Sequence, residues 1–214
     1  MTTIPTAISR SYTGSNQTII TAGEGTGTMY YRYKLSTSST WSSWDIAVPS
    51  VSAAGTYNIE YYAAASTNHT QSATGTLNST MSKISRTLSF AQSYAVVAPS
   101  GSVTLTATPS AGAGDGTITY SISSTTYATI NSSTGAVTAK TSDGSAIVTA
   151  TISEGTNYQS ATVSYNLYVF ADTHNYSYTG SVQSVTLPPG SYKLQCWGAQ
   201  GGANAANSTY GITA

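Results

Sequence analysis

Short runs in which apolar and polar residues alternate recur along the chain and indicate β-strands. The clearest runs cover residues 29–35, 57–62, 103–109, 118–122 and 146–152. Clusters of Gly, Ser and Asn separate such runs at intervals of about 8 to 12 residues. No window carries an apolar stripe at the helical period, and the β-branched content disfavours helices. The pattern predicts an all-β fold of the sandwich type.

Glycine positions between these runs predict where the chain turns. Residues 22–27 are rich in Gly, and Asp-Gly pairs stand at Asp115-Gly116 and Asp143-Gly144. In residues 127–139 two short alternating runs flank Gly135. A tight turn between two strands needs a residue with positive φ, so we expect Gly135 to supply it.

Two phrases occur twice, at a spacing typical of domains. Residues 67–74 (TNHTQSAT) are echoed by residues 156–162 (TNYQSAT), and residues 12–19 (YTGSNQTI) are echoed by residues 178–185 (YTGSVQSV). Echoes at this spacing indicate tandem modules rather than one large core. We expect an Ig-like sandwich at residues 1–84, a second at 85–170, and at 171–214 the first strands of a further β module that is cut short.

Longer motifs carry resemblances to known families. Residues 128–139 (ATINSSTGAVTA) and 144–152 (GSAIVTATI) resemble the group-2 bacterial Ig-like family, also called the invasin/intimin-like family. Residues 25–34 (GTGTMYYRYK) and 54–64 (AGTYNIEYYAA) resemble bacterial Ig-like repeats of surface and phage proteins. These resemblances imply tandem Ig-like β-sandwiches used as spacer or display modules. Residues 192–202 (YKLQCWGAQGG) resemble the entry to glycine-rich domains of bacterial and phage surface proteins, so we expect a longer protein.

Composition narrows the partners. Only 7% of the 214 residues are charged, the formal net charge is zero, and Ser and Thr make up about a third of the chain. No basic stripe could follow a phosphate backbone, so nucleic-acid binding is not expected. No stretch approaches the roughly 20 apolar residues that span a membrane, and the N-terminus does not look like a signal peptide.

Residues with catalytic or metal-binding chemistry are scattered. His69 and His174 lie in different modules and are expected to be exposed loop residues. Cys196 alternates with apolar neighbours and is expected to be a small buried residue. The acids are well separated, and we interpret Asp115 and Asp143 as turn formers rather than Ca²⁺ ligands. We therefore expect no enzyme activity, no catalytic residue, no metal and no cofactor.

Aromatic residues of the first module are the candidate contacts. Trp41 and Trp44 could stack on sugar rings, or they could be structural, one in the core and the other capping a hairpin. Tyr30, Tyr31 and Tyr62 lie in runs that place rings on both faces of a sheet. The outward rings could form an interface with a neighbouring subunit, since tyrosine is common in interfaces.

These observations favour a structural role. The main hypothesis is a phage virion protein, namely a head fibre or capsid decoration protein on the virion surface. Its expected partners are capsid or tail proteins and a second copy of the chain. Host-surface glycans are a further candidate partner. The alternative is a bacterial cell-surface adhesin stalk whose export signal lies outside this chain. A third class is a carbohydrate-active enzyme with these modules as accessories, which requires a catalytic domain beyond Ala214.

Overall fold

The computed structural model describes residues 1–110 and 115–198 and holds fifteen β-strands and no helix within those ranges. The all-β expectation is confirmed. Long strands such as β5 (Gly55–Ala63) and β14 (Gly144–Ile152) bury every second residue, because successive side chains of a strand point to opposite faces. The alternation in the sequence therefore marks the core face of each sheet.

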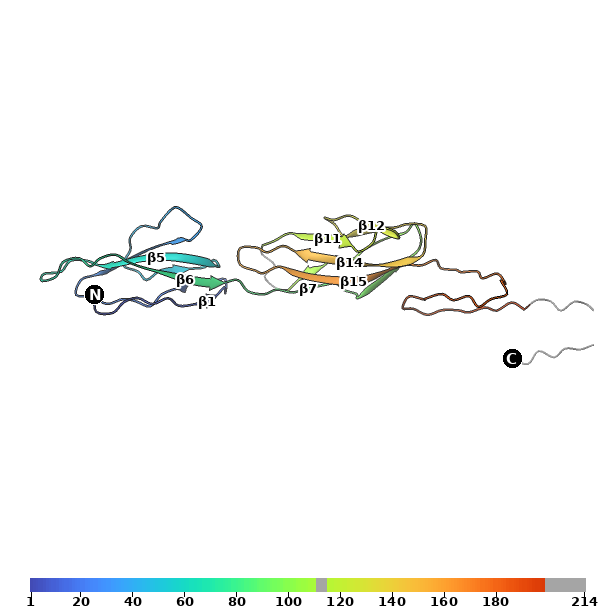
Figure 1. Cartoon of the computed structure of the whole chain (residues 1–214), viewed down its shortest axis with the longest axis horizontal. Helices are drawn as coiled ribbons and strands as arrows, with labels where there is room; N and C mark the ends of the chain where they lie inside the picture. The colour runs from blue at the N-terminus through green and yellow to red at the C-terminus, as the bar shows by residue number, and fades with distance from the viewer. Residues whose placement is uncertain (111–114, 199–214) are drawn as a thin grey trace, which may run out of the picture. The chain divides into compact units, whose positions relative to one another are not determined.

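Six strands between residues 10 and 82 form the first sandwich (Figure 1). One sheet has the order β1-β6-β5-β3, with β1 parallel to β6 and the other pairs antiparallel, and β2 pairs with β4 in a second sheet. Ile19, Ile20 and Val51 pack against Tyr57 and Ile59 across the core. Besides β5, the strands are β1 (Arg10–Ser11), β2 (Gln17–Thr18), β3 (Met29–Leu35), β4 (Ser50–Val51) and β6 (Gly75–Ser82).

Nine strands between residues 88 and 169 form the second sandwich. A sheet of order β8-β15-β14-β11 faces a sheet of order β12-β13-β9, and β7 pairs with β10. Val148, Tyr165 and Leu167 pack against Ala128 and Val137 between the sheets. Besides β14, the strands are β7 (Leu88–Ser89), β8 (Tyr94–Val97), β9 (Ser102–Thr104), β10 (Thr108–Pro109), β11 (Ile118–Ile122), β12 (Ala128–Ile130), β13 (Ala136–Ala139) and β15 (Ala161–Val169).

The four-stranded sheets of the two sandwiches share one strand order. In the second, β8 is parallel to β15 and is followed by β14 and β11, which repeats the order β1-β6-β5-β3 of the first. The β5–β6 connection thus corresponds to the β14–β15 connection. We propose that the two groups of strands are the modules expected at residues 1–84 and 85–170, and we call them module one and module two.

Residues 176–198 belong to a separate compact unit and contain no strand. The first strands of the further β module expected at 171–214 are therefore absent from the described residues of that range, 171–198. Val182, Leu194 and Trp197 are largely exposed. An isolated pair of strands is at best marginally stable in water, and residues 176–198 alone offer no third strand for a strand pair to pack against.

Candidate functional site

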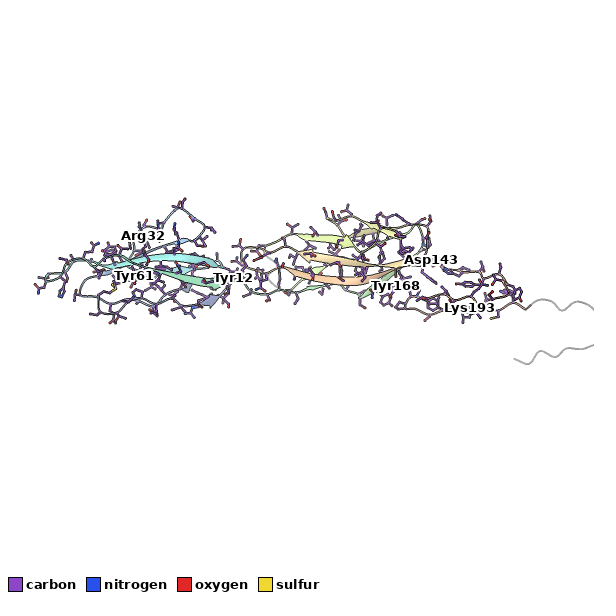
Figure 2. The ribbon with its side chains drawn as sticks, in the orientation of Figure 1. Tyr12, Arg32, Tyr61, Asp143, Tyr168 and Lys193 are labelled. Carbon is purple, nitrogen blue, oxygen red and sulfur yellow. The ribbon has the colours of Figure 1, made fainter. Side chains whose placement is uncertain are left out.

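The outward face of β3 and β5 gathers most of the candidate aromatic residues. Tyr30, Arg32 and Lys34 of β3 face away from the core and lie opposite Tyr62, Glu60 and Asn58 of β5. Figure 2 marks the two faces of this sheet, with Arg32 on the outward face and the buried Tyr61 on the core face.

The loop between β3 and β4 folds back along the free edge of β3. Asp45 and Tyr31 exchange two backbone hydrogen bonds of 2.7 and 2.9 Å. The Ser42 N–H donates to the Tyr33 carbonyl, and the Ser42 hydroxyl oxygen accepts from the Tyr33 N–H at 3.0 Å. These bonds cover backbone groups that an edge strand would otherwise leave unpaired, and they hold both loop tryptophans beside the sheet.

The two tryptophans enter a continuous row of rings and cations, which we call the ladder (Lys34, Trp41, Arg32, Trp44, Tyr62 and Tyr30). The Lys34 ammonium lies 5.1 Å from the Trp41 ring centre, and the Arg32 guanidinium lies 4.8 Å from Trp41 and 4.6 Å from Trp44. Trp44 meets Tyr62 edge-on at 4.8 Å, and Tyr62 stacks on Tyr30 at 5.3 Å. Glu60 pairs with Arg32 at 2.5 Å.

The structure therefore brings together four of the five candidate residues and separates the fifth. Tyr31 is 3% exposed, and its hydroxyl accepts from the Gly23 N–H at 2.9 Å inside module one. Trp41 and Trp44 are half-buried on the outer face. Neither tryptophan belongs to the buried core, so the expectation that one of them would lie there is wrong. The ladder could not be predicted from sequence spacing, because only the fold-back of the β3–β4 loop brings Trp41 and Trp44 onto Arg32.

A second arrangement, which the sequence did not predict, joins the two modules. The Asn157 backbone oxygen accepts from the Ile84 N–H at 3.1 Å, and the Gln159 N–H donates to the Ile84 oxygen at 3.0 Å. The Asn157 side-chain oxygen accepts from the Ala54 N–H at 2.9 Å. The turn between β14 and β15 thus binds backbone at the start of β5 and at the end of β6, and we call this contact the junction.

Side chains close the junction on both sides. Lys83 donates to the Glu154 carboxylate at 2.5 Å and to the Gly155 carbonyl at 2.7 Å. The rings of Tyr12 and Tyr158 meet edge-on at 5.6 Å, and Tyr12 is labelled in Figure 2. The Tyr57 hydroxyl donates to the Ala53 carbonyl at 2.8 Å. Burial, with a smaller effect of Tyr33, raises the pKa of Tyr57.

A buried charge supports the junction turn from behind. The Arg86 side chain is 1% exposed, lies 3.7 Å from the Asp115 carboxylate and donates to the carbonyls of Asp115 and Ser153. Asp115 also accepts from the Asn157 N–H at 2.8 Å. Gly155 leaves room for this carboxylate, because a Cβ there would lie 2.0 Å from it. Asp115 is therefore a partner of the junction turn as well as a turn residue.

Other candidate residues take different positions. His69 is exposed as expected, but His174 contacts the Asp143 carboxylate and stacks on Phe170 at 4.3 Å, so it is not a simple exposed residue. Cys196 is exposed, and the expectation of burial was wrong because no strand forms there to give it an inner face.

The described ranges hold neither a metal-ligand cluster nor a membrane-spanning helix. Residues 1–110 and 115–198 contain no group of three or more His, Cys, Asp or Glu side chains that could hold a metal ion. No helix in those ranges is long and apolar enough to cross a membrane.

Module one has an open depression on its surface. Residues that line it include Gly23, Glu24, Tyr31, Ile46 and Val48, and Glu24 is the one carboxylate among the lining residues.

Several solved structures are similar to this chain at low sequence identity. Among similar solved structures are the CbhA fibronectin(III)-like modules of Clostridium thermocellum (17% identity, 82% of this chain, 100% of that chain, TM-score 0.32). Others are a C-terminal intimin fragment in complex with the intimin-binding domain of its translocated receptor (12%, 79%, 63%, 0.29) and a SusE-like surface-located polysaccharide-binding protein of Bacteroides thetaiotaomicron (17%, 76%, 33%, 0.30).

The family assignment of module two depends on the sequence match and not on the structural similarities. All these TM-scores lie below 0.5, and no curated protein sequence matches the chain. The model of the bacterial Ig-like domain (group 2) matches residues 84–163, from the junction residue Ile84 into β15. Residues 84–163 are thus a bacterial Ig-like domain of group 2, in an all-β chain of Ig-like sandwiches.

Proposed function

We propose that the chain is a non-enzymatic structural and display protein of a phage virion, a head fibre or capsid decoration protein whose Ig-like modules act as spacers. The observation that carries the spacer role is the junction. Hydrogen bonds from Ala54, Ile84 and Lys83 meet one turn of module two, and the buried Arg86 supports that turn. A spacer needs such contacts because a linker alone would leave its modules free to rotate.

The surface composition supports an exposed location. With 7% charged residues and about a third Ser and Thr, the surface is polar without being strongly charged. Such a surface does not attract nucleic acid or anionic membranes. The alternative location is a bacterial cell surface, where the same modules would form an adhesin stalk.

Immunogold electron microscopy distinguishes the two locations. Antibodies raised against module two are applied to purified phage particles from the source culture and to uninfected cells. We expect gold on the particles and the chain in their mass spectra. Gold on uninfected cells alone supports the adhesin stalk, and absence from both overturns a surface role.

Adhesion to glycans is a separate part of the proposal and involves the ladder. Trp41, Trp44, Tyr30 and Tyr62 are the proposed contacts, with the outward rings as an alternative interface between copies. A glycan array with Trp41→Ala and Trp44→Ala tests it, with the exposed Tyr94→Ala of module two as control. Loss of binding in the first two variants alone supports the glycan contact, and absence of any binding by the native chain leaves the ladder structural.

A further inference from the structure

The repeated phrase of residues 67–74 and 156–162, here called the TN-x-QSAT echo, forms in each module a turn closed by a corresponding backbone hydrogen bond. In module one, Ser66 and His69 exchange backbone hydrogen bonds of 2.9 and 3.2 Å, and in module two the Gly155 N–H donates to the Tyr158 oxygen at 3.0 Å. The turns occupy the corresponding β5–β6 and β14–β15 connections. The module-two turn makes the junction, whereas the module-one turn follows the far end of β5, away from the junction.

In module two the repeated side chains serve the junction rather than their own turn. The Asn157 side-chain oxygen accepts from the Ala54 N–H of module one, and the Gln159 side-chain oxygen accepts from the Ser85 hydroxyl of the linker at 2.9 Å. Neither bond closes the turn itself. Turn formation therefore does not explain why Asn and Gln recur at these places.

In module one the same residue types face solvent. Asn68, His69 and Gln71 are exposed, and the side chains of Asn68 and Gln71 make no hydrogen bond to any residue in the described ranges. They correspond to Asn157, Tyr158 and Gln159. Module one thus presents, at its free end, a copy of the turn that docks module two.

We propose that the turn Ser66–His69, with Gln71, is the docking surface for a further Ig-like module on the N-terminal side of module one. The end of that module would present what module one presents to module two: a backbone N–H like that of Ala54 to the Asn68 side chain, and a ring like that of Tyr12 to His69.

A second copy of this chain does not fit this role. The end of its module one that carries Ala54 and Ile84 is already covered by its own Asn157. The partner is therefore an additional module, and the proposal rests on the junction geometry rather than on a virion or cellular location.

A chain with one added module tests the proposal. Thr3 bridges to Glu24 as Leu88 pairs with Pro109, so Met1 corresponds approximately to Arg86. A second copy of residues 1–85 placed directly before Met1 of the full chain keeps the linker length found at the junction. Trypsin cleavage after Lys83 of the added copy, followed by mass spectrometry, reports whether the new linker is held.

The substitution Asn68→Ala in the native module should speed cleavage at the added Lys83 about fivefold, the value expected for one hydrogen bond. Asn157→Ala should do the same at the native Lys83. Thr70→Ala is the matched control, because Thr70 lies in the same exposed loop and is the residue that the module-two copy lacks; it should change nothing.

Two results would overturn the proposal. In the first, Asn157→Ala speeds cleavage at its linker while Asn68→Ala does not. In the second, the added copy is digested internally, which shows that it has neither docked nor been stabilised. Neither result depends on where the protein is located, so the proposed virion role is tested separately.

Discussion

Ionising the hydroxyl of Tyr165 is unfavourable in the folded chain. Its ring is 2% exposed and packs edge-on against Phe90 at 4.8 Å, and its hydroxyl has no hydrogen-bond partner in the described ranges. Burial, with a smaller effect of Tyr120, raises the pKa of Tyr165 to about 12. Between about pH 10 and about pH 12 the unfolded chain loses this proton first, so the free energy of unfolding falls as pH rises.

The substitution Tyr165→Phe should therefore reduce the loss of stability between about pH 9 and about pH 11.5. Near neutral pH the variant should be as stable as the native chain or more stable, because a buried hydroxyl without a partner is removed. Urea denaturation at both pH values measures the difference. Tyr94→Phe, at an exposed position of the same module, is the control. An alkaline loss identical to that of the native chain would contradict the prediction.

Arg86 should contribute far more to stability than its neighbour Lys83. Removing the buried guanidinium leaves the Asp115 carboxylate without its counter-ion and the carbonyls of Asp115 and Ser153 without their Arg86 donors, so Arg86→Met should cost about 3 kcal/mol. Lys83→Met removes a pair whose Glu154 side chain is 58% exposed, and it should cost less than about 1 kcal/mol. Urea denaturation followed by circular dichroism compares them. Equal effects of the two substitutions would contradict the buried pairing.

Some single residues were predictable and others were not. Gly135 has φ +74°, as expected for a tight turn between strands, because glycine adopts that conformation without strain. Arg86 and Asp115 stand 29 residues apart in no motif, and only the tertiary fold buries one beside the other. The local conformation at Gly135 could therefore be predicted from the sequence, whereas the buried pair of Arg86 and Asp115 could not.

At the scale of an element, the ladder should hold the β3–β4 loop against the sheet. Arg32 touches both loop tryptophans and pairs with Glu60. Arg32→Met should loosen the loop and speed hydrogen exchange of the Tyr31 amide, which donates to Asp45. Cation–π contacts at partly exposed sites contribute about 1 kcal/mol each, so the exchange rate should rise about fivefold or more.

Exchange measured by nuclear magnetic resonance resolves the amide concerned. Arg10→Met is the matched control, because the exposed Arg10 makes one side-chain hydrogen bond of 3.3 Å, to the Thr18 carbonyl, and does not touch the loop. Unchanged exchange at Tyr31 in Arg32→Met would show that the backbone bonds hold the loop without the ladder.

An alternating run predicted a strand correctly where the whole run lies in one sheet. The alternation of residues 57–62 and 146–152 matches β5 and β14, each buried on one face. Residues 103–109 also alternate, but the run splits into β9 and β10, which pair with β13 and β7 in different sheets. Residues 182–196 alternate without forming strands. Periodicity indicates a face but does not reveal which strand, if any, lies beside it.

At the scale of the molecule, the repeated phrases have two different meanings. Gly14 and Gly180 both have positive φ, and Gln17 and Gln183 each donate to a carbonyl six residues earlier. The YTGS echo is thus a local turn, which explains why it recurs even where no strands follow. The TN-x-QSAT echo instead places its side chains at a module end, where one copy is engaged.

The junction should transmit a substitution in module two to the stability of module one. Trp41 and Trp44 lie in module one, so with Trp197→Phe as background the tryptophan fluorescence reports that module alone. Tyr158→Ala removes the ring that packs on Tyr12. Because aromatic pairs contribute about 1 kcal/mol, the fluorescence midpoint in urea should fall.

A double-mutant cycle assigns that effect to the junction. Tyr12→Ala combined with Tyr158→Ala should lower the midpoint less than the sum of the single changes, with a coupling of about 1 kcal/mol. Tyr94→Ala, in module two but remote from the residues that contact module one, should leave the fluorescence midpoint unchanged. Independent modules would give no response to Tyr158→Ala and strictly additive effects, and a spacer of coupled modules requires the opposite result.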